Sequence, residues 1–389
     1  MKQYIFRSII IFALFGYFSS NIVAQNSTGT TITYNFGTQY QLQSKILGET
    51  RQLLIYVPEK YKKSTEKFPV IYVLDGDKHY KHAIVSAEKL QKNGLIPASI
   101  IVAIPDNKGT HMRDYTQDSD KFSRFLREEV QSFVTKNFRT NEYKTLYGHS
   151  RPGAFVLETF VKEPNAFNSY IAASPVTSKK ILTKFEKLFD KNTMLNQTIY
   201  FTVGGIDNEG SRSVNLMKSL SDLLTKRAPK SLQWKHTHLT QHYHHTTSNG
   251  TFYDGLAESF TDYQDPIISS YQQYLDGNGM DGIKAYFKKR ALKYYTDEKI
   301  TVNAIAGFGF TFMFDNKAQQ AVDLLLDDIK NNHPTSIKLY GVLSAAYRTL
   351  GLKDKTLKVL EKMVSMAKQQ NDPQLDRYES SLKRFKKSL

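Results

Sequence analysis

Short apolar runs recur along the first two thirds of the chain, and each is bounded by Gly, Pro, Asn or Asp. The run FPVIYVL at 68–74 is continuous, and IPASIIVAI at 96–104 is nearly so. Continuous runs of this length are typical of strands buried on both faces of a sheet. By the same pattern, further strands are predicted at 52–58, 144–147, 167–174, 197–203 and 234–238.

Stretches with helical periodicity lie between these strands, notably at 84–95 and 122–138. Strands that alternate with helices of ten or more residues predict an α/β fold, a mostly parallel sheet with helices on both faces. Residues 26–45 are rich in Thr, Gln and Ser and are expected to form an ordered edge or loop. In such folds the active-site residues gather on loops beyond the C-terminal ends of the strands.

The pattern changes after about residue 265, where strand-like runs stop and long helical stretches begin. Two segments are related at an offset of 37 residues, one around Phe310 and one around Tyr347. This spacing is near the ~34 residues of a tetratricopeptide helix pair, although a plain helical bundle explains it equally well. Two hairpins alone cannot bury a solenoid core, so we expect them to pack against the first domain or a partner. The sequence therefore divides into an α/β domain at 25–265 and an all-α extension at 266–389.

The N-terminus has the pattern of a secretory signal peptide. Lys2 and Arg7 precede and flank an apolar run at 9–15, and IVAQ at 22–25 suits cleavage after Ala24. The run is too short for a transmembrane helix of about 20 residues, and no later segment reaches that length. We therefore expect 1–24 to be removed and the mature protein to be exported, either periplasmic or secreted.

The amino-acid composition excludes several kinds of site and partner. The chain has no cysteine, which excludes disulfides, thiolate catalysis and zinc-thiolate sites. Its formal net charge is +16, which favours anionic partners. The lysines are spread along the chain, and export removes access to nucleic acid, so the interpretation is a solvated basic surface and no nucleic-acid partner.

The stretch YGHSRPGAF at 147–155 carries the strongest chemical signal. It places Ser150 in a Gly-x-Ser turn between a predicted strand and a predicted helix, which raises a serine hydroxyl above a sheet where a base can reach it. Position 152 is proline instead of the usual glycine. Proline is tolerated in the first turn of a helix, but it disfavours helical geometry at Arg151. We expect an active but slower site than one with Gly or Ala at this position.

An acid and a base follow the serine in the order that an α/β-hydrolase triad requires. The strand at 197–203 runs into GGIDNE, which offers Asp207 as the preferred acid and Glu209 as the alternative. The last strand is followed by the histidine-rich segment 240–247, where the base is expected. An oxyanion hole needs two backbone N–H groups. Arg151 would supply one of them, and Gly76 or Asp77, after the strand at 68–74, would supply the other.

These motifs together resemble the exported esterases related to enterochelin esterase and esterase D. The resemblance covers roughly 45–260 and rests on FPVIYVLDG, IIVAIPDN with MRDYT, YGHSRPGAF with FNSYIAASP, and TFYDGL. It implies cofactor-free serine hydrolysis of an ester, with His244, twelve residues before Leu256, as the base and Asp207 in a Gly-x-x-Asp/Glu turn as the acid. It also implies a tetratricopeptide-like extension, and small or oligomeric substrates such as siderophore lactones or aryl and acetyl esters of polysaccharide.

Several alternatives stay open. The histidines at 236, 238, 242, 244 and 245 could bind a metal, since imidazoles suit zinc or copper. A serine peptidase would share the triad, and a weak or inactive hydrolase could serve as a scaffold that binds a partner or itself through the C-terminal helices. The Arg151 side chain either holds an anionic part of a substrate or pairs with a neighbouring Asp or Glu. Asp114 is interpreted as a loop anchor, and His149 as a packing or hydrogen-bonding residue of the turn.

Overall fold

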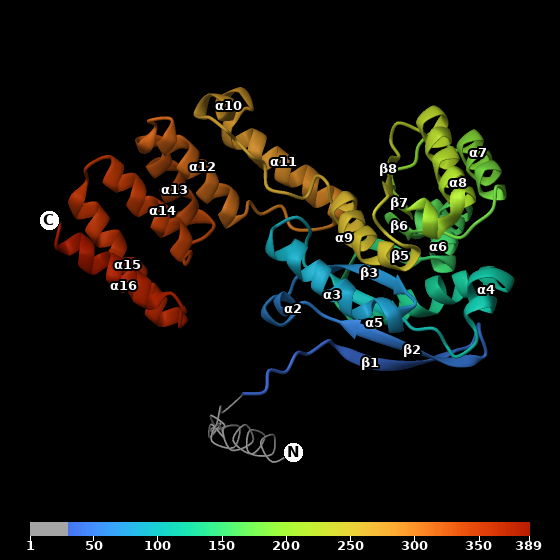
Figure 1. The fold of residues 1–389 in the computed structure, drawn as a ribbon. Helices are drawn as coiled ribbons and strands as arrows, with labels where there is room; N and C mark the ends of the chain where they lie inside the picture. Colours follow the sequence, from blue (N-terminus) through green and yellow to red (C-terminus); the bar gives the residue numbers. More distant parts are fainter. Residues whose placement is uncertain (1–29) are drawn as a thin grey trace, which may run out of the picture. The chain divides into compact units, whose positions relative to one another are not determined.

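A single mostly parallel sheet organises the first part of the chain (Figure 1). The computed structural model describes residues 30–389, apart from the side chains of 206–208, so the predicted signal peptide at 1–24 lies outside the described residues. Residues 36–389 form one unit, and all that follows concerns it. We call residues 36–265 the hydrolase region and residues 266–389 the helical region.

The sheet has eight strands in the order β1-β2-β4-β3-β5-β6-β7-β8. β1 pairs with β2, and β2 with β4, in antiparallel fashion, and the other neighbours are parallel. The strands are β1 (Thr38–Ser44), β2 (Glu49–Tyr56), β3 (Phe68–Leu74), β4 (Ile100–Ile104), β5 (Thr140–His149), β6 (Ser169–Ala173), β7 (Thr198–Gly204) and β8 (Gln233–Leu239).

Both faces of the sheet are covered, because successive strand side chains point to opposite sides. In β3, Tyr72 belongs to one buried cluster and Val73 to the other. One face is covered by α3 (Gly76–Lys92) and α9 (Thr247–Ser259). The other face is covered by α4 (Ser119–Arg124), α5 (Gln131–Asn137), α6 (Arg151–Lys162), α7 (Lys180–Lys191) and α8 (Ile206–Arg227), while the short α2 (Glu59–Lys63) precedes β3. The predicted α/β-hydrolase architecture is confirmed.

Helices alone make up the helical region. Its elements are α10 (Tyr271–Asp276), α11 (Gly279–Tyr294), α12 (Val302–Phe314), α13 (Ala318–Asn331), α14 (Ile337–Thr349), α15 (Lys353–Gln370) and α16 (Leu375–Lys386). The starts of α12 and α13 recur in α14 and α15 at an offset of 35 residues (302 to 337 and 318 to 353). These two hairpins pack together around their own apolar core, with Phe308, Leu325 and Leu343 in it.

The two regions share a buried aromatic cluster at the end of α11. The ring of Tyr294 is fully buried and lies 5.2 Å from the rings of both Tyr143 and Phe260. Asn141, near the start of β5, donates side-chain hydrogen bonds to the backbone oxygens of Tyr294 and Tyr295. The end of α11 thus contributes to the core of the hydrolase region. Within residues 30–389, no helix combines the length and the apolar character needed to cross a membrane.

Candidate active site

Ser150 occupies the turn between β5 and α6 in a backbone conformation that side chains rarely adopt. Its φ is 65° and its ψ is −119°, a conformation that costs about 1–3 kcal/mol and needs support from its surroundings. Two hydrogen bonds with the end of β6 and the loop that follows it supply that support. The Ser150 N–H donates to the oxygen of Ala173 over 2.9 Å, and the Val176 N–H donates to the oxygen of Ser150 over 3.1 Å. The turn therefore presents the hydroxyl at the carboxyl edge of the sheet.

The residues that flank the turn are small because the chain nearly touches itself there. A Cβ atom on Gly148 would lie 2.5 Å from the carbonyl of Pro152, and one on Gly153 would lie 2.9 Å from the oxygen of Ala173. Pro152 itself is buried in the first turn of α6, where its missing N–H has no helical partner to lose. The helix begins at Arg151, so the proline does not delay the helix start.

The structure brings Ser150, His244 and Glu209 into one hydrogen-bonded chain. His244 Nε2 lies 3.0 Å from Ser150 Oγ, and His244 Nδ1 lies 3.0 Å from Glu209 Oε2. His244 stands in a short 3₁₀ turn after β8, and Glu209 in the first turns of α8 after β7. The histidine side chain is 24% exposed and the glutamate 3%, so solvent reaches the histidine while the carboxylate is buried.

The carboxylate of Glu209 is held ionised despite its burial. Burial alone would raise its pKa, but hydrogen bonds from His244, Ser174 and the backbone N–H of Gly204 outweigh this and lower the pKa. The Gly204 N–H donates to Glu209 Oε1 over 3.1 Å. A carboxylate bonded on both oxygens can hold the imidazole in one tautomer and stabilise its positive charge.

This geometry favours the second of the two acids that the sequence offers. The sequence pattern predicts Asp207 as the acid, whereas Nδ1 of His244 is paired with Glu209. The side chain of Asp207 lies outside the described residues. The sequence signal that was missed is the start of α8, which places Glu209 one turn inside the helix, with its N–H bonded to the oxygen of Gly205.

The loops that carry the acid and the base are joined directly. The Gly205 N–H donates to the oxygen of His242 over 2.7 Å. A Cβ atom on Gly205 would lie 2.6 Å from the oxygen of Thr240, and one on Gly204 would lie 2.9 Å from the oxygen of His242. Both glycines are thus required for this close approach, which sets Glu209 against His244.

Further histidines, whose pKa values are lowered by burial, lie next to His244 and to one another. His149 Nε2 donates to the backbone oxygen of His244 over 2.8 Å, and the two rings lie 4.9 Å apart. His79 packs against His149 and lies within hydrogen-bond distance of His82, 3.0 Å from Nδ1 to Nε2. Burial lowers the pKa of His79 to about 3 and that of His82 to about 4, and it also lowers the pKa of His149. The interpretation of His149 as a hydrogen-bonding residue of the turn agrees with these contacts, whereas His79 and His82 were not singled out.

The backbone groups expected in the oxyanion hole belong to two adjacent helix starts. β3 and β5 are parallel neighbours, with Val73 opposite Tyr147, so α3 and α6 begin at the same edge of the sheet. Gly76 and Asp77 open α3, and Arg151 opens α6, where N–H groups have no helical partner. A Cβ atom on Gly76 would lie 2.8 Å from Cβ of Ala103, so glycine is needed there.

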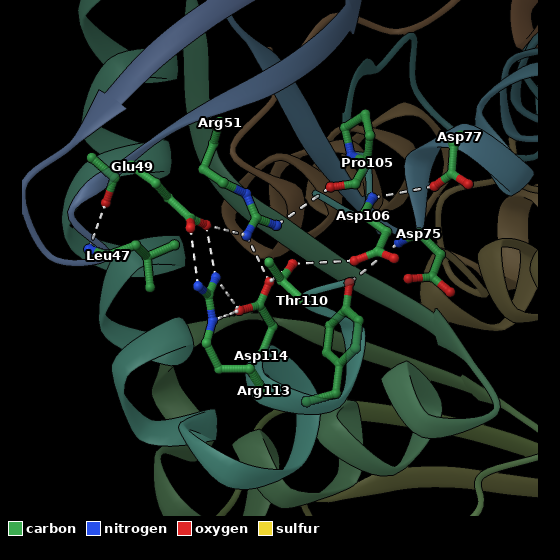
Figure 2. Close-up of polar contacts among 12 residues, drawn as sticks. Leu47, Glu49, Arg51, Asp75, Asp77, Pro105, Asp106, Thr110, Arg113 and Asp114 are labelled. Carbon is green, nitrogen blue, oxygen red and sulfur yellow. Dashed lines mark hydrogen bonds and ion pairs between the residues drawn. The ribbon is translucent and has the colours of Figure 1, made fainter. Parts of the chain in front are cut away.

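A polar network anchors the segment Asp75–Asp77 (Figure 2). The Asp106 N–H donates to Oδ1 of Asp77 over 3.2 Å, and the Asp75 N–H donates to the hydroxyl of Tyr115 over 3.4 Å. Thr110 connects the loop after β4, because its hydroxyl oxygen lies 3.2 Å from a carboxylate oxygen of Asp106 and 3.0 Å from one of Asp114 and can donate its one proton to either. These contacts tie the candidate oxyanion segment to the loop that precedes α4.

Two arginines complete the network. Arg51, on β2, donates to Asp114 over 2.6 Å, and both side chains are nearly inaccessible to solvent. Arg113 binds Glu49 through two nitrogens, which lowers the pKa of Glu49 to about 2 against the opposing effect of burial. Asp114 is therefore bonded as the loop anchor that the sequence indicated, and it takes no part in the Ser150 chain.

A pocket of about 360 Å³ opens at the start of α6, directly after Ser150 in the sequence, although Ser150 itself does not line it. Arg151 is part of its wall, together with the apolar or aromatic side chains of Met112, Tyr115, Phe155 and Val176. Another pocket, of about 410 Å³, lies around Phe68 and Arg290, at the edge of the sheet opposite to the one that carries Ser150. The first pocket is the candidate binding site.

The clustered histidines do not converge. His236 stacks on Phe201 at 4.7 Å, His238 bonds to the oxygen of Gly204, and His242 bonds to the oxygen of Thr246. His244 bonds to Ser150 and Glu209. Among the residues that the structure describes, no group of three or more His, Cys, Asp or Glu side chains is placed to hold a metal. The alternative of a metal site at 236–245 has no support in this geometry.

The mostly parallel sheet, the strained serine turn and the Ser–Glu–His order together define the α/β-hydrolase class. Comparison with known proteins narrows this class further. The model of the Esterase family matches residues 44–263, more than half of the chain, and the chain belongs to that family.

Individual relatives are more distant. The ferri-bacillibactin esterase BesA of Bacillus subtilis is 24% identical over 186 residues, and the match covers 40% of this chain and 60% of that esterase. Among solved structures, an IroE-like serine hydrolase from Shewanella oneidensis has a TM-score of 0.60 at 24% identity and covers 74% of this chain and 98% of its own. An uncharacterised protein from Capnocytophaga ochracea has a TM-score of 0.62 at 15% identity and covers 90% and 99%. These two structures share the fold.

Proposed function

We propose that the protein is a serine-dependent carboxylic ester hydrolase that works through an acyl-enzyme. The observation that carries this proposal is the pair of 3.0 Å contacts from Ser150 to His244 and from His244 to Glu209. Membership of the Esterase family makes ester hydrolysis the activity to expect. The hydrolase region, together with the end of α11, would carry the reaction.

In the first half-reaction, His244 Nε2 takes the proton of Ser150 as the hydroxyl oxygen attacks the ester carbonyl. Glu209 stabilises the imidazolium that forms. The N–H groups of Arg151 and of Gly76 or Asp77 bind the negative oxygen of the tetrahedral intermediate. The carbon–oxygen bond to the alcohol then breaks, and His244 gives its proton to the departing alcohol. Ser150 is left acylated.

In the second half-reaction, His244 takes a proton from water, and the water oxygen attacks the acyl carbon. Breakdown of the second intermediate returns the proton to Ser150 and releases the carboxylic acid. The substrates we propose are siderophore lactones, or aryl and acetyl esters of polysaccharide. The named activity of the Bacillus subtilis relative favours the first group. Export after cleavage at Ala24 is part of this proposal and would be checked by N-terminal sequencing of the mature protein.

A fluorophosphonate probe tests the nucleophile directly. The probe should label the wild-type protein at Ser150, and Ser150→Ala should lose the label together with about 10⁶-fold of ester turnover. Ser178→Ala, an exposed serine in the wall of the same pocket, is the matched control and should still be labelled. A folded protein that takes no label would overturn the proposal in favour of a binding scaffold. Loss of turnover on chelation would support a metal enzyme, and comparison with an amide substrate would separate an esterase from a peptidase.

A further inference from the structure

The side chain of Arg151 is a cation without an anionic partner beside the reacting serine. Its backbone follows Ser150 directly at the start of α6, and its side chain is exposed in the wall of the 360 Å³ pocket. Across residues 30–389, leaving aside the three undescribed side chains at 206–208, no carboxylate forms an ion pair with it. The alternative of a salt bridge to a neighbouring Asp or Glu is therefore not what this geometry shows.

The other cations of the same pocket are neutralised. Lys184 pairs with Glu158, which is itself a pocket residue, and Lys162 pairs with Asp120. Arg151 is thus the one lining cation of this pocket, among the described residues, that lacks a carboxylate. Its positive charge is therefore available to bind an anionic group of a substrate in the pocket.

Three buried carboxylates of the hydrolase region are also occupied. Asp75 pairs with Lys78 and His111, Asp114 with Arg51 and Arg113, and Glu209 with His244. None of them is left to turn toward Arg151 without giving up a buried contact, which would leave a charge unpaired at a cost of several kcal/mol. The pocket therefore keeps a positive charge on the residue that directly follows Ser150.

The chemistry of guanidinium indicates which group it suits. Its planar fork donates two parallel hydrogen bonds to a group that shares one negative charge between two neighbouring oxygens, as a carboxylate does. The apolar side chains of Met112, Tyr115 and Phe155 would contact the carbon part of such a substrate. A pocket of this volume lies at the lower end of the range for small-molecule sites, about 300–1,000 Å³.

We propose that Arg151 is a specificity-determining residue that selects esters bearing a carboxylate close to the scissile bond. This inference rests on the proposed function, since it names the substrate class of the same site. Two pairs of esters test it, and each pair compares a carboxylate with its methyl ester. One pair carries the group on the acyl side (4-nitrophenyl hydrogen terephthalate against 4-nitrophenyl methyl terephthalate). The other carries it on the alcohol side (4-acetoxybenzoate against methyl 4-acetoxybenzoate).

The quantity to measure is the ratio of kcat/KM for the anionic ester to that for its neutral partner. The wild-type protein should prefer the anionic ester in at least one pair, and the pair that responds tells which side of the ester enters the pocket. Arg151→Met should lower the ratio by about tenfold to a hundredfold, mainly through KM, because a charge-assisted hydrogen bond is lost. Arg151→Lys should recover part of it, and added salt should weaken the preference.

Lys162→Met is the matched control, because it removes a cation of the same pocket that already has a partner. Its ratio should stay within about twofold of wild type. An unchanged ratio in Arg151→Met, or an equal fall in Lys162→Met, would overturn the inference while leaving ester hydrolysis intact. Failure of every ester together with no fluorophosphonate labelling would instead overturn the proposed function.

Discussion

The hydrolase region and the helical region place their polar side chains in different ways. In the first, parallel strands end at one edge, so residues as distant in sequence as Ser150, Glu209 and His244 meet there. In the second, antiparallel helix hairpins bring together residues of neighbouring helices, as in the exposed pairs Lys368–Glu379 and Lys386–Glu361. The carboxyl edge of a parallel sheet therefore brings polar side chains together at one place, whereas helix hairpins distribute them along a surface.

The largest expected effect concerns Glu209, the carboxylate at the carboxyl edge of the sheet. Glu209→Gln should lower kcat/KM for an ester by about 10⁴-fold, because the imidazolium loses its carboxylate and the tautomer is no longer fixed. Asp207→Asn, two residues away, is the control and should change the rate by less than about tenfold. Steady-state kinetics on one neutral aryl ester decides between them. A larger loss of kcat/KM in Asp207→Asn than in Glu209→Gln would identify Asp207 as the acid instead.

The second-largest expected effect concerns the buried aromatic cluster that the two regions share at the end of α11. Tyr294→Ala removes a fully buried ring that packs on Tyr143 and Phe260, and it should lower the free energy of unfolding by about 3–5 kcal/mol. Leu292→Ala on the same helix is the control, because Leu292 is 69% exposed and should cost less than about 0.5 kcal/mol. Denaturant unfolding measures both. An equally small loss of unfolding free energy in both variants would mean that the aromatic cluster contributes nothing to stability.

Acid should act on the hydrolase region through its buried histidines. His79 and His82 have pKa values of about 3 and about 4 in the fold, because burial disfavours their charged forms. The unfolded chain therefore binds more protons between about pH 4 and 6.5, so stability falls as the pH is lowered through that window. Each histidine contributes up to about 1.4 kcal/mol per pH unit. Unfolding curves at several pH values should show a shallower dependence in His82→Gln, and an unchanged dependence would refute the assignment.

The smallest effect concerns Pro152. Replacing it with Ala should raise kcat by up to about threefold, because proline constrains the backbone of Arg151, whose N–H is expected to bind the oxyanion. The modest size follows from α6 already beginning at Arg151. Pre-steady-state acylation rates are the suitable readout. If the rate does not change, proline at this position is no handicap.

Much of the hydrolase region could be predicted from apolar runs. The strand at 68–74 has the predicted bounds, because all seven of its side chains are buried and nothing in its pattern depends on distant contacts. β1 has no such signal, since TQYQLQS is mostly polar, and its pairing with β2 makes it a strand. The choice between Asp207 and Glu209 depends on where α8 begins and on the path of the His242 loop, and both are set by tertiary contacts.

The aromatic cluster at the end of α11 also decides where the chain can be cut. Cleavage after residue 265 would remove Tyr294 and leave the rings of Tyr143 and Phe260 in contact with water at the start of the strand that ends in the nucleophile turn. A shortened protein that stops after Tyr295 keeps both the ring and the two backbone oxygens that Asn141 binds. The smallest self-sufficient catalytic unit is therefore longer than the α/β sequence pattern alone indicates.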